Sequence, residues 1–376
     1  MVRFLQTSDW QMGITRRFLG SDAGSRFRQA RLDAVRRLCR LADERGCECI
    51  IVCGDLFESS QVAPATIRQT LEAMSASRVH IYILPGNHDP LDTASAYDKS
   101  EFRNGKPDCV TVIRNNSPIT VSPGFEIVGV PWTSKRPGFD AVAATLAALE
   151  PAYGVVRVLL AHGAMDYLTP EEQGHSVIAH KMLEDAIDKK LIHFAALGDR
   201  HSTTDCGSTG RIWYSGTPEV TAHREGNPGN VLVVNVTDTD CNCESVRVGE
   251  WAFLDWAATP MNNAEDLKVF VDRLKAVADK SRTVLRLELA GTHDLETGHA
   301  LKQVLEHYGS LFASLDADEA GLVLEPGEQE LASLQLKGYA KETLSQLQQK
   351  ISDGGPEAQT ARDAVALLYR LAGGGR

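Results

Sequence analysis

Short apolar runs alternate with longer stretches of helical periodicity along the first two hundred residues. The strand-like runs RFLQTS and ECIIVCGD bracket a helical pattern at about 26–45, and a second helical pattern at about 64–76 leads into HIYILPG. Later runs of strand character are FEIVGVPW, GVVRVLLAHG, HFAALGD, RIWYSG and GNVLVVNV. Because strands and helices alternate, this region predicts an α/β fold in which helices flank the sheet.

The pattern changes between Trp251 and Asn263, where we expect a second unit to begin. The elements predicted after this point are a helix at 264–280, a strand at TVLRLELAG, a helix at 295–308, strand-like LFASL and GLVLEPG, and helices at about 338–351 and 356–372. We therefore expect three parts: a large α/β domain over 1–250, a smaller α+β domain over 251–337, and a helical segment over 338–376.

Each of the last two predicted helices carries one apolar stripe. The stripes consist of Ala340, Leu344, Leu347 and Ile351, and of Ala361, Ala364, Val365, Leu368 and Leu371. Such stripes suit docking on a partner helix, but they suit equally well a pair of helices that pack on each other or on the preceding domain.

Composition indicates a globular protein without a membrane span. The chain has 376 residues, too many for one ordinary core, with 43% hydrophobic and 24% charged residues. No apolar run reaches the roughly 18 residues that a bilayer requires. The start MVRFLQTSDW lacks the features of a signal peptide, so we expect a cytoplasmic location. None of the eight cysteines forms a CxxC pair, and we expect buried thiols and no disulfides.

Charge is unevenly distributed. The net charge of −11 argues against broad nonspecific adhesion to nucleic acid. Yet eight arginines and only two acidic residues lie between Ile14 and Arg40. This run predicts either a solvated face of the first helix or a patch that binds phosphates.

Five strand ends carry residues that can bind a metal. They are SDWQ (Asp9, Gln11), CGDLFE (Asp55), PGNHDP (Asn87, His88, Asp89), LLAHG (His162) and LGDRHS (Asp199, His201). Ligands of α/β sheets bind in the crevice beyond the carboxyl ends of the strands, so these tips can converge on one site. GNHD is the most specific of the five, because three such residues in a row have few structural uses.

Spacing within the tips gives a second argument. In extended chain, residues i and i+2 point to one side, so Asp199 and His201 should project together while Arg200 points away. The same alternation pairs Asp9 with Gln11. Gly54, Gly86 and Gly198 beside the ligands are what tight turns with close backbone approach require.

This series of motifs resembles the calcineurin-like metallophosphoesterases, whose pattern is D-x-H, GD, GNH-D/E, a later H, and GH-x-H. The stretches FLQTSDWQMG, GDLFE, PGNHDP and YSGTPE resemble most the SbcD type of DNA-repair nuclease. The resemblance covers about 1–250 closely and the remainder only by domain order. It implies a layered sandwich of mixed β-sheets flanked by helices, a DNA-contacting cap domain and a C-terminal helix pair.

The resemblance also implies two metal ions that share Asp55. The implied ligands of the first ion are Asp9, Gln11, Asp55 and His201, and those of the second are Asp55, Asn87, His162 and Asp199. His88 is implied to lie beside the scissile phosphate, where it donates a proton to the leaving oxygen or stabilises charge. Asp89 is implied to orient His88 by a hydrogen bond.

Three positions depart from the family pattern. Gln11 and Asp199 replace histidines, and Glu58 stands where many nucleases of this type have a histidine after GDLF. The ligand set then has five oxygen donors and two imidazoles, which favours harder ions than Zn²⁺. We expect Mn²⁺, with Mg²⁺ or Fe²⁺ as alternatives.

The implied activity is hydrolysis of DNA phosphodiester bonds by a two-metal mechanism in DNA repair. The implied partners are DNA, an SbcC-like ABC-type coiled-coil ATPase and a second copy of the chain in a homodimer. Arg16, Arg17 and Arg26 are the candidate DNA contacts. Two alternatives stay open: a phosphodiesterase or phosphatase for a small substrate, and a scaffold subunit with a degenerate metal site.

Overall fold

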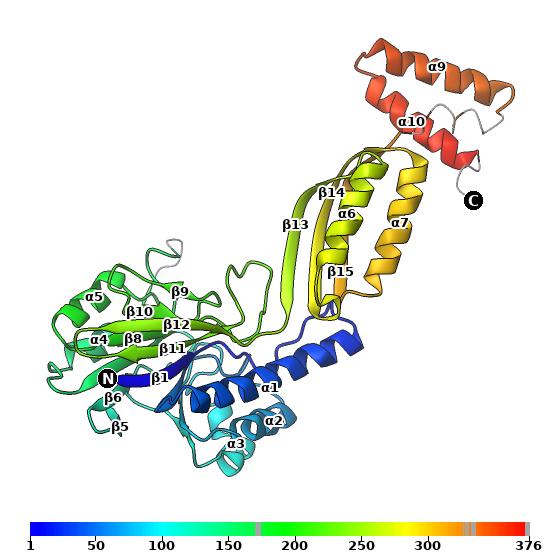
Figure 1. Cartoon of the computed structure of the whole chain (residues 1–376). Helices are drawn as coiled ribbons and strands as arrows, with labels where there is room; N and C mark the ends of the chain where they lie inside the picture. The colour runs from blue at the N-terminus through cyan, green and yellow to red at the C-terminus, as the bar shows by residue number, and fades with distance from the viewer. Residues whose placement is uncertain (170–173, 326, 328–330, 332–335, 373–376) are drawn as a thin grey trace. The chain divides into compact units, whose positions relative to one another are not determined.

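The computed structural model describes all residues except 170–173, 326, 328–330, 332–335 and 373–376. The chain divides into two compact units, Met1–Trp251 and Ala252–Arg376 (Figure 1). Over the described residues, no helix combines the length and the apolar content needed to cross a membrane.

The first unit is built on two mixed β-sheets. The strand order of the first sheet is β12 (Cys241–Arg247), β11 (Asn230–Val236), β1 (Val2–Thr7), β2 (Cys49–Cys53), β3 (His80–Leu84) and β4 (Val110–Val112). That of the second is β5 (Ile119–Ser122), β6 (Phe125–Gly129), β7 (Val156–His162), β8 (Phe194–Gly198), β10 (Ile212–Tyr214) and β9 (Thr204–Asp205). β1 to β4 are parallel, as are β6, β7, β8 and β10.

The two sheets pack face to face around an apolar core. Phe4 of β1 stacks on Phe125 of β6 at a centroid distance of 5.8 Å and meets Phe194 of β8 edge-on at 5.7 Å. Ile51 and Leu160 belong to the same cluster. Because large apolar side chains interlock here, the carboxyl ends of the parallel strands in both sheets are held in fixed positions.

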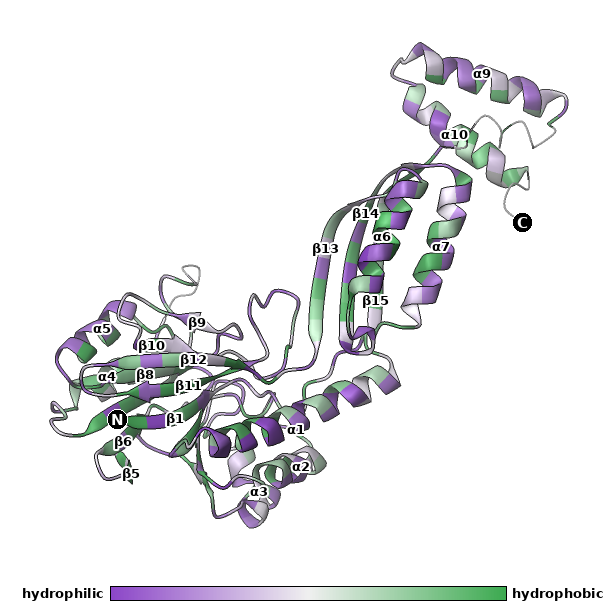
Figure 2. Ribbon diagram, in the orientation of Figure 1, coloured by the Kyte–Doolittle hydropathy of each residue, from purple (hydrophilic) through white to green (hydrophobic). Residues whose placement is uncertain are grey.

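Helices cover the outer faces of both sheets. The first sheet packs on α1 (Ser21–Glu44), α2 (Pro64–Met74), η1 (Ala96–Asp98) and α3 (Ser100–Gly105), and the second on α4 (Ala141–Ala147) and α5 (His180–Asp188). With both faces buried, the central strands read as nearly continuous apolar runs. Figure 2 shows this in the hydrophobic colouring of β11, beside the alternating polar and apolar positions of α1.

The predicted mixed α/β class is confirmed, but some elements differ from the prediction. α1 begins at Ser21, five residues before the predicted start at 26. β12 escaped prediction because its residues are mostly exposed or half-buried and its sequence CNCESVR lacks an apolar run. β13 (Ala252–Pro260) escaped for a similar reason, since most of its side chains remain outside the core.

The second unit is a parallel three-stranded sheet with helical connections. The elements after β13 are α6 (Ala264–Ala276), η2 (Lys280–Arg282), β14 (Thr283–His293), α7 (Leu295–Gly309) and β15 (Ser314–Leu324). Trp256, Phe270 and Leu287 belong to its core. The two strand-like stretches expected at LFASL and GLVLEPG form one strand, β15, and Pro326 lies outside the described residues.

The last two helices, α9 (Tyr339–Asp353) and α10 (Ala358–Leu371), group with the second unit and do not form a separate third part. Leu344 of one predicted stripe and Val365 of the other lie in one apolar cluster together with Tyr369. The stripes therefore pack against each other. Leu371, at the end of the second stripe, is 77% exposed. Residues 373–376 of the predicted segment 338–376 lie outside the described residues.

Candidate metal centre

The candidate ligands follow the carboxyl ends of strands from both sheets. Asp9, Asp55 and Asn87 come after β1, β2 and β3, which are parallel neighbours in the first sheet. His162 ends β7, and Asp199 follows its parallel neighbour β8. Because parallel strands end at the same edge, both sheets direct their loops to one place.

The loops that carry these ligands are not extended. Residues of the site with left-handed backbone are Asp9 (φ 54°), Gln11 (φ 43°), Asp55 (φ 55°) and Asp199 (φ 96°). Such conformations are costly for residues other than glycine and concentrate at functional sites. Strand alternation was therefore the wrong reason for pairing Asp199 with His201, since β8 already ends at Gly198.

The prediction for Arg200 is also wrong. Its side chain was expected to point away from the site, but Arg200 lines the same cavity as Asp199 and His201. Nε of Arg200 donates to Oγ1 of Thr204 at 2.9 Å. The turn after Gly198 brings three consecutive residues to one cavity, which a strand could not do.

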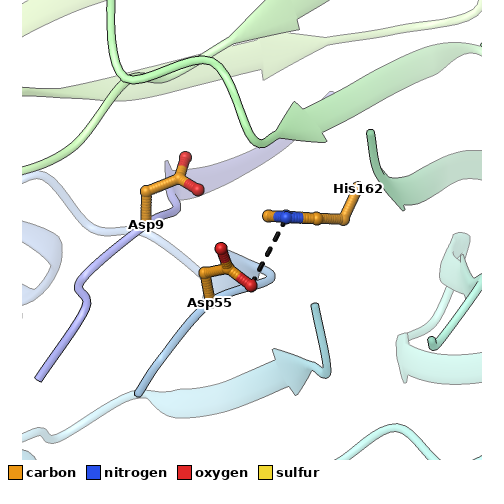
Figure 3. Close-up of side chains that lie close together, drawn as sticks. All are labelled: Asp9, Asp55 and His162. Atoms are coloured by element: carbon orange, nitrogen blue, oxygen red, sulfur yellow. Dashed lines mark ion pairs between the residues drawn. The ribbon is translucent and has the colours of Figure 1, made fainter. Parts of the chain in front are cut away.

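Asp9, Asp55 and His162 form the buried centre of the site. One ligand atom of each lies within 4.8 Å of those of the other two, and Figure 3 shows the three side chains directed toward one another. Nε2 of His162 lies 3.4 Å from Oδ1 of Asp55, the ion pair drawn as a dashed line (Figure 3). All three residues are nearly inaccessible to solvent.

A backbone carbonyl fixes the orientation of His162. Nδ1 of the ring lies 2.8 Å from the carbonyl oxygen of Cys53, and since a carbonyl can only accept, Nδ1 carries the hydrogen. In the neutral ring, Nε2 is then the nitrogen with a free lone pair, and it faces Asp55. Within the described part of the chain, this buried Nε2 has no hydrogen-bond partner. A metal ion is the natural partner for such an atom.

Two glycines permit this close approach. A Cβ on Gly54, whose φ is +92°, would lie 2.0 Å from Nδ1 of His162. A Cβ on Gly198 would lie 1.8 Å from the carbonyl oxygen of Cys53. The predicted close backbone approach is confirmed at both positions, because no side chain fits there.

Asp199 and Asn87 extend the site on one side. Oδ1 of Asp199 lies 3.7 Å from Nε2 of His162 and accepts from Nδ2 of Asn87 at 3.4 Å. Oδ1 of Asn87 is buried and has no hydrogen-bond partner among the described residues. An amide oxygen without a partner beside two carboxylates suits a hard cation.

Gln11 and His201 extend the site on the other side. The Gln11 amide lies 3.2 Å from Nε2 of His201, and the same Nε2 lies 4.0 Å from Oδ1 of Asp9. Nδ1 of His201 faces Oγ1 of Thr221 at 2.7 Å and Oε1 of Glu225 at 2.8 Å. All seven candidate ligands are thus connected by short distances.

Known proteins place the chain in a family. A family model of the calcineurin-like phosphoesterases matches residues 2–234, which is more than half of the chain. The chain belongs to the calcineurin-like phosphoesterase family. This assignment covers the unit that holds the candidate ligands, and it makes the chain a member of a family of metal-dependent hydrolases that bind two divalent ions. No curated protein matches the chain.

The chain is similar to several solved structures, at low identity and with TM-scores below 0.5. TT1561 of Thermus thermophilus is 11% identical with a TM-score of 0.40, over 65% of this chain and 99% of that one. The purple acid phosphatase PPD1 from seeds of yellow lupin, Lupinus luteus, is 14% identical with a TM-score of 0.41, over 66% and 51%. A dimetal phosphatase from Danio rerio is 9% identical with a TM-score of 0.39, over 65% and 98%.

The chemistry of the residues fits the divalent metals of a calcineurin-like phosphoesterase. Burial raises the pKa of Asp9 to about 6, and the neighbouring charge of Asp55 acts in the same direction. Three carboxylates around His162 repel one another without a cation, and divalent ions remove this repulsion. Together with the buried Nε2 of His162 and Oδ1 of Asn87, which lack partners among the described residues, this supports a site built for cations.

His88 stands at the open side of the candidate site, with 43% of its side chain exposed. Nδ1 of His88 lies 2.8 Å from the carbonyl oxygen of Glu58, so Nδ1 carries a hydrogen. Nε2 lies 4.0 Å from Oδ2 of Asp55. It is therefore Nε2 that can give or take a proton in the cavity.

The predicted role of Asp89 is wrong. Asp89 accepts from the backbone N–H of Gly86 at 2.8 Å and of Phe57 at 2.9 Å, and from the hydroxyl of Tyr97 at 2.6 Å. It is fully buried, and the hydrogen-bond partner of the His88 ring is Glu58. Asp89 thus holds the loops around Asn87 and Asp55 in place. Burial, with the charge of Asp55, raises its pKa to about 6.

A cavity of about 580 Å³ opens at the candidate site. Its lining includes Gln11, Arg16, Asp55, Glu58, His88, Asp199, Arg200, His201 and Arg224. Of the candidate DNA contacts, Arg16 is among the lining residues, whereas Arg17 and Arg26 are not. Arg26 forms an ion pair with Asp22, one turn earlier in α1. Of the two alternatives for the arginine run, Arg26 therefore fits the solvated helix face better than the patch that binds phosphates.

Sequence reasoning missed Thr221 and Glu225, which hold His201, and Tyr97, which holds Asp89. Thr221 and Glu225 lie in the loop TAHREG, which has no periodicity, and their effect depends on contact with a residue some 20 positions earlier. An acidic residue after YSGTPE is the only available signal, and it does not by itself indicate a histidine partner. Oε2 of Glu58 is also buried, and no described residue gives it a hydrogen bond.

Proposed function

We propose that this calcineurin-like phosphoesterase is a DNA nuclease subunit in DNA repair that hydrolyses phosphodiester bonds with two divalent metal ions. The observation that carries the proposal is the cavity of about 580 Å³, where His88 and three arginines face the same space as four of the candidate ligands, Gln11, Asp55, Asp199 and His201. Nuclease chemistry requires these parts together: cations for the phosphate, a proton donor for the leaving oxygen, and positive charge for the strand.

Mn²⁺ is the ion that the donor set favours, with Mg²⁺ or Fe²⁺ as alternatives. Asp9, Asp55 and Asp199 offer carboxylate oxygens, and amide oxygens from Gln11 and Asn87 join them. When bound, such ions act as Lewis acids on the phosphate and lower the pKa of a water molecule. The two imidazoles, of His162 and His201, are too few for a site that prefers Zn²⁺.

His88 supplies the proton for the leaving oxygen. The carbonyl of Glu58 fixes the ring through Nδ1, which leaves Nε2 in the cavity. A protonated Nε2 placed beside the scissile bond lowers the barrier by general acid catalysis, a contribution of about 10²–10⁴ in rate. The backbone N–H of His88 donates to Oδ1 of Asp55 at 3.0 Å and ties the acid to the metal ligand.

DNA, a second copy of the chain and an SbcC-like ABC-type coiled-coil ATPase are the proposed partners. The surface available for a helical partner is narrower than the stripes suggested, because Leu344 and Val365 are buried between α9 and α10. Leu367, Leu371 and Tyr339 are the large apolar side chains of this helix pair that remain exposed. They are the candidates for docking the coiled coil.

A cleavage assay tests the proposal. The purified chain is incubated with Mn²⁺ and DNA of defined ends, alone and with its ATPase, beside His88→Ala and Asp199→His. We expect cleavage by the wild type, a loss of about 10²-fold or more in His88→Ala, and retained metal binding in Asp199→His. Absence of cleavage by the wild type in both settings contradicts the proposal.

A phosphodiesterase for a small substrate is the second candidate. A volume of about 580 Å³ falls within the range typical of small-molecule pockets, roughly 300–1,000 Å³. Turnover of bis(p-nitrophenyl) phosphate that an excess of DNA leaves unaffected would favour this candidate. Inhibition by DNA favours the nuclease. Failure to find bound metal by elemental analysis would instead favour a scaffold role.

A further inference from the structure

Three arginines line the cavity beside the candidate metal ligands: Arg16, Arg200 and Arg224. They come from separate loops, after β1, after β8 and between β10 and β11. Within the described residues, none of the three forms an ion pair with a carboxylate. Other arginines of the first unit do: Arg26 pairs with Asp22, Arg36 with Glu72, Arg37 with Glu250 and Arg45 with Glu244.

Two of the three guanidinium groups are anchored in the same way. Nε of Arg16 donates to the carbonyl oxygen of Thr221 at 2.7 Å, and Nε of Arg200 donates to Oγ1 of Thr204 at 2.9 Å. Each anchor uses the inner nitrogen and, within the described chain, leaves both terminal nitrogens without a protein acceptor. A guanidinium held at Nε presents its remaining N–H groups as a fixed pair of donors, the geometry that matches phosphate oxygens.

The charge balance of the cavity indicates why positive side chains are needed there to bind an anion. Five carboxylates lie in or beside the cavity, those of Asp9, Asp55, Glu58, Asp199 and Glu225. The three guanidinium groups leave an excess of two negative charges, and two bound divalent cations would change this to an excess of two positive charges. With the scissile phosphate at the cations, the three arginines would remain available for another anion.

We propose that Arg16, Arg200 and Arg224 form a phosphate subsite that binds a backbone phosphate next to the scissile one. This inference rests on the proposed nuclease function and specifies its substrate: a nucleic acid strand with at least two consecutive phosphates, and not an isolated phosphodiester. Arg224, which is exposed, contacts the strand at the outer wall of the cavity, and Arg16 and Arg200 contact it further in.

Cleavage of two short substrates tests the subsite. The dinucleotide TpT has one phosphodiester, and the trinucleotide TpTpT has two. We expect the wild-type chain with Mn²⁺ to prefer TpTpT in kcat/KM, and we expect Arg200→Gln and Arg224→Gln each to lower the ratio of the two kcat/KM values about tenfold. The matched control is Arg68→Gln, an exposed arginine of α2 that is not among the lining residues and should keep the ratio.

Binding gives a readout that does not depend on turnover. In the His88→Ala background with Mn²⁺, the affinity for labelled TpTpT is measured against salt concentration. Removing one arginine–phosphate interaction should reduce the slope of log K against log salt by about 0.7, the value for single strands. Arg16→Gln also loses the anchor to Thr221, so its thermal unfolding is compared with that of the wild type.

The outcomes separate the two proposals. If the wild type cleaves neither TpT, TpTpT nor longer DNA, the nuclease function is overturned. If the wild type cleaves these substrates but Arg200→Gln and Arg224→Gln keep both the substrate ratio and the salt slope, the phosphate subsite is overturned and the nuclease function stands. Equal losses on TpT and TpTpT also overturn the subsite, since they would show that the arginines act on the scissile phosphate itself.

Discussion

Oε1 of Glu225 lies 2.8 Å from Nδ1 of His201, while Nε2 of the same ring lies 4.0 Å from Oδ1 of Asp9. The carboxylate therefore fixes the ring from its outer nitrogen and directs the inner one to the candidate metal centre. Burial opposes protonation, but Glu225 and Asp9 together raise the pKa of His201 above its ordinary value. Hydrogen bonds and the charge of His201 in turn overcome burial and lower the pKa of Glu225.

We expect Glu225→Ala to lower the affinity for Mn²⁺ about 10- to 100-fold, because partners of this kind orient a metal-binding imidazole and raise its basicity. Glu225→Gln keeps an acceptor without the charge and should lose less. Calorimetric titration of the metal-free chain with Mn²⁺ measures the effect. The control is Glu306→Ala, an exposed residue of α7. Equal affinities in Glu225→Ala and the wild type would show that Glu225 does not position a ligand.

We expect Gly198→Ala to destabilise the first unit by about 1–3 kcal/mol or more, because the added methyl group would lie 1.8 Å from the carbonyl oxygen of Cys53. The same shift should move Asp199 and reduce metal binding. Thermal unfolding measures the stability. Gly309→Ala is the control, since a Cβ at this helical position meets nothing within 4 Å, and it should leave stability equal or slightly higher. A wild-type melting temperature in Gly198→Ala would contradict the tight strand contact.

The pKa of Asp9 predicts how the stability of the metal-free chain depends on pH. Because burial raises this pKa to about 6 from 3.8, the folded state binds more protons than the unfolded state between these values. The free energy of unfolding of the wild type should therefore fall, relative to that of Asp9→Asn, as pH rises through this window. Urea unfolding with a chelator at about pH 4 and about pH 8 measures the difference.

Addition of Mn²⁺ should stabilise the wild type more than Asp9→Asn. Saturating metal stabilises the wild type by mass action, about 2.7 kcal/mol at a hundredfold excess over Kd. Asp9→Asn lacks one carboxylate of the buried triad and should gain much less. If Mn²⁺ raises the melting temperature of both proteins equally, Asp9 is not a ligand.

We expect Tyr97→Phe to cost about 1–3 kcal/mol, because the hydroxyl donates to a fully buried carboxylate of Asp89 that is left short of a donor. Asp89→Asn in the same background should recover part of the loss, since it removes the buried charge. A double-mutant cycle from urea unfolding gives the coupling free energy. Additive losses in the two single variants would show that the hydroxyl and the carboxylate act independently.

The sequence could predict the tips that carry Asp9, Asp55, Asn87 and His162, because an apolar run followed by a polar side chain is a local signal of a strand end. It also predicted the mixed α/β class, since alternation of elements along the chain reflects how they layer. The backbone conformation after each strand end was harder to predict from the sequence. Left-handed backbone at Asp199 depends on contact with another loop, where its N–H donates to the carboxylate of Asp9 at 3.1 Å.

The partners of the tips could not be predicted from spacing. Glu225 meets His201 across a loop, and Tyr97 meets Asp89 from the short helix η1, so neither pair follows the period of a helix or strand. Asp89 was assigned to His88 because the two are adjacent in sequence, but their side chains serve different partners. The arginines could not be distinguished from the sequence either. Arg16 and Arg26 lie in the same arginine-rich run, and only the fold shows that Arg26 pairs with Asp22 while Arg16 lines the cavity.

The chain passes from the first unit to the second at one point, after Trp251, whose ring packs edge-on against Phe27 at 5.0 Å. Every candidate ligand, the proposed proton donor His88 and the three cavity arginines precede this point. A single recombination event in the gene could therefore replace the whole second unit and leave the unit with the candidate site intact. Such an exchange would give the same candidate metal centre a different neighbouring unit without altering any of its ligands.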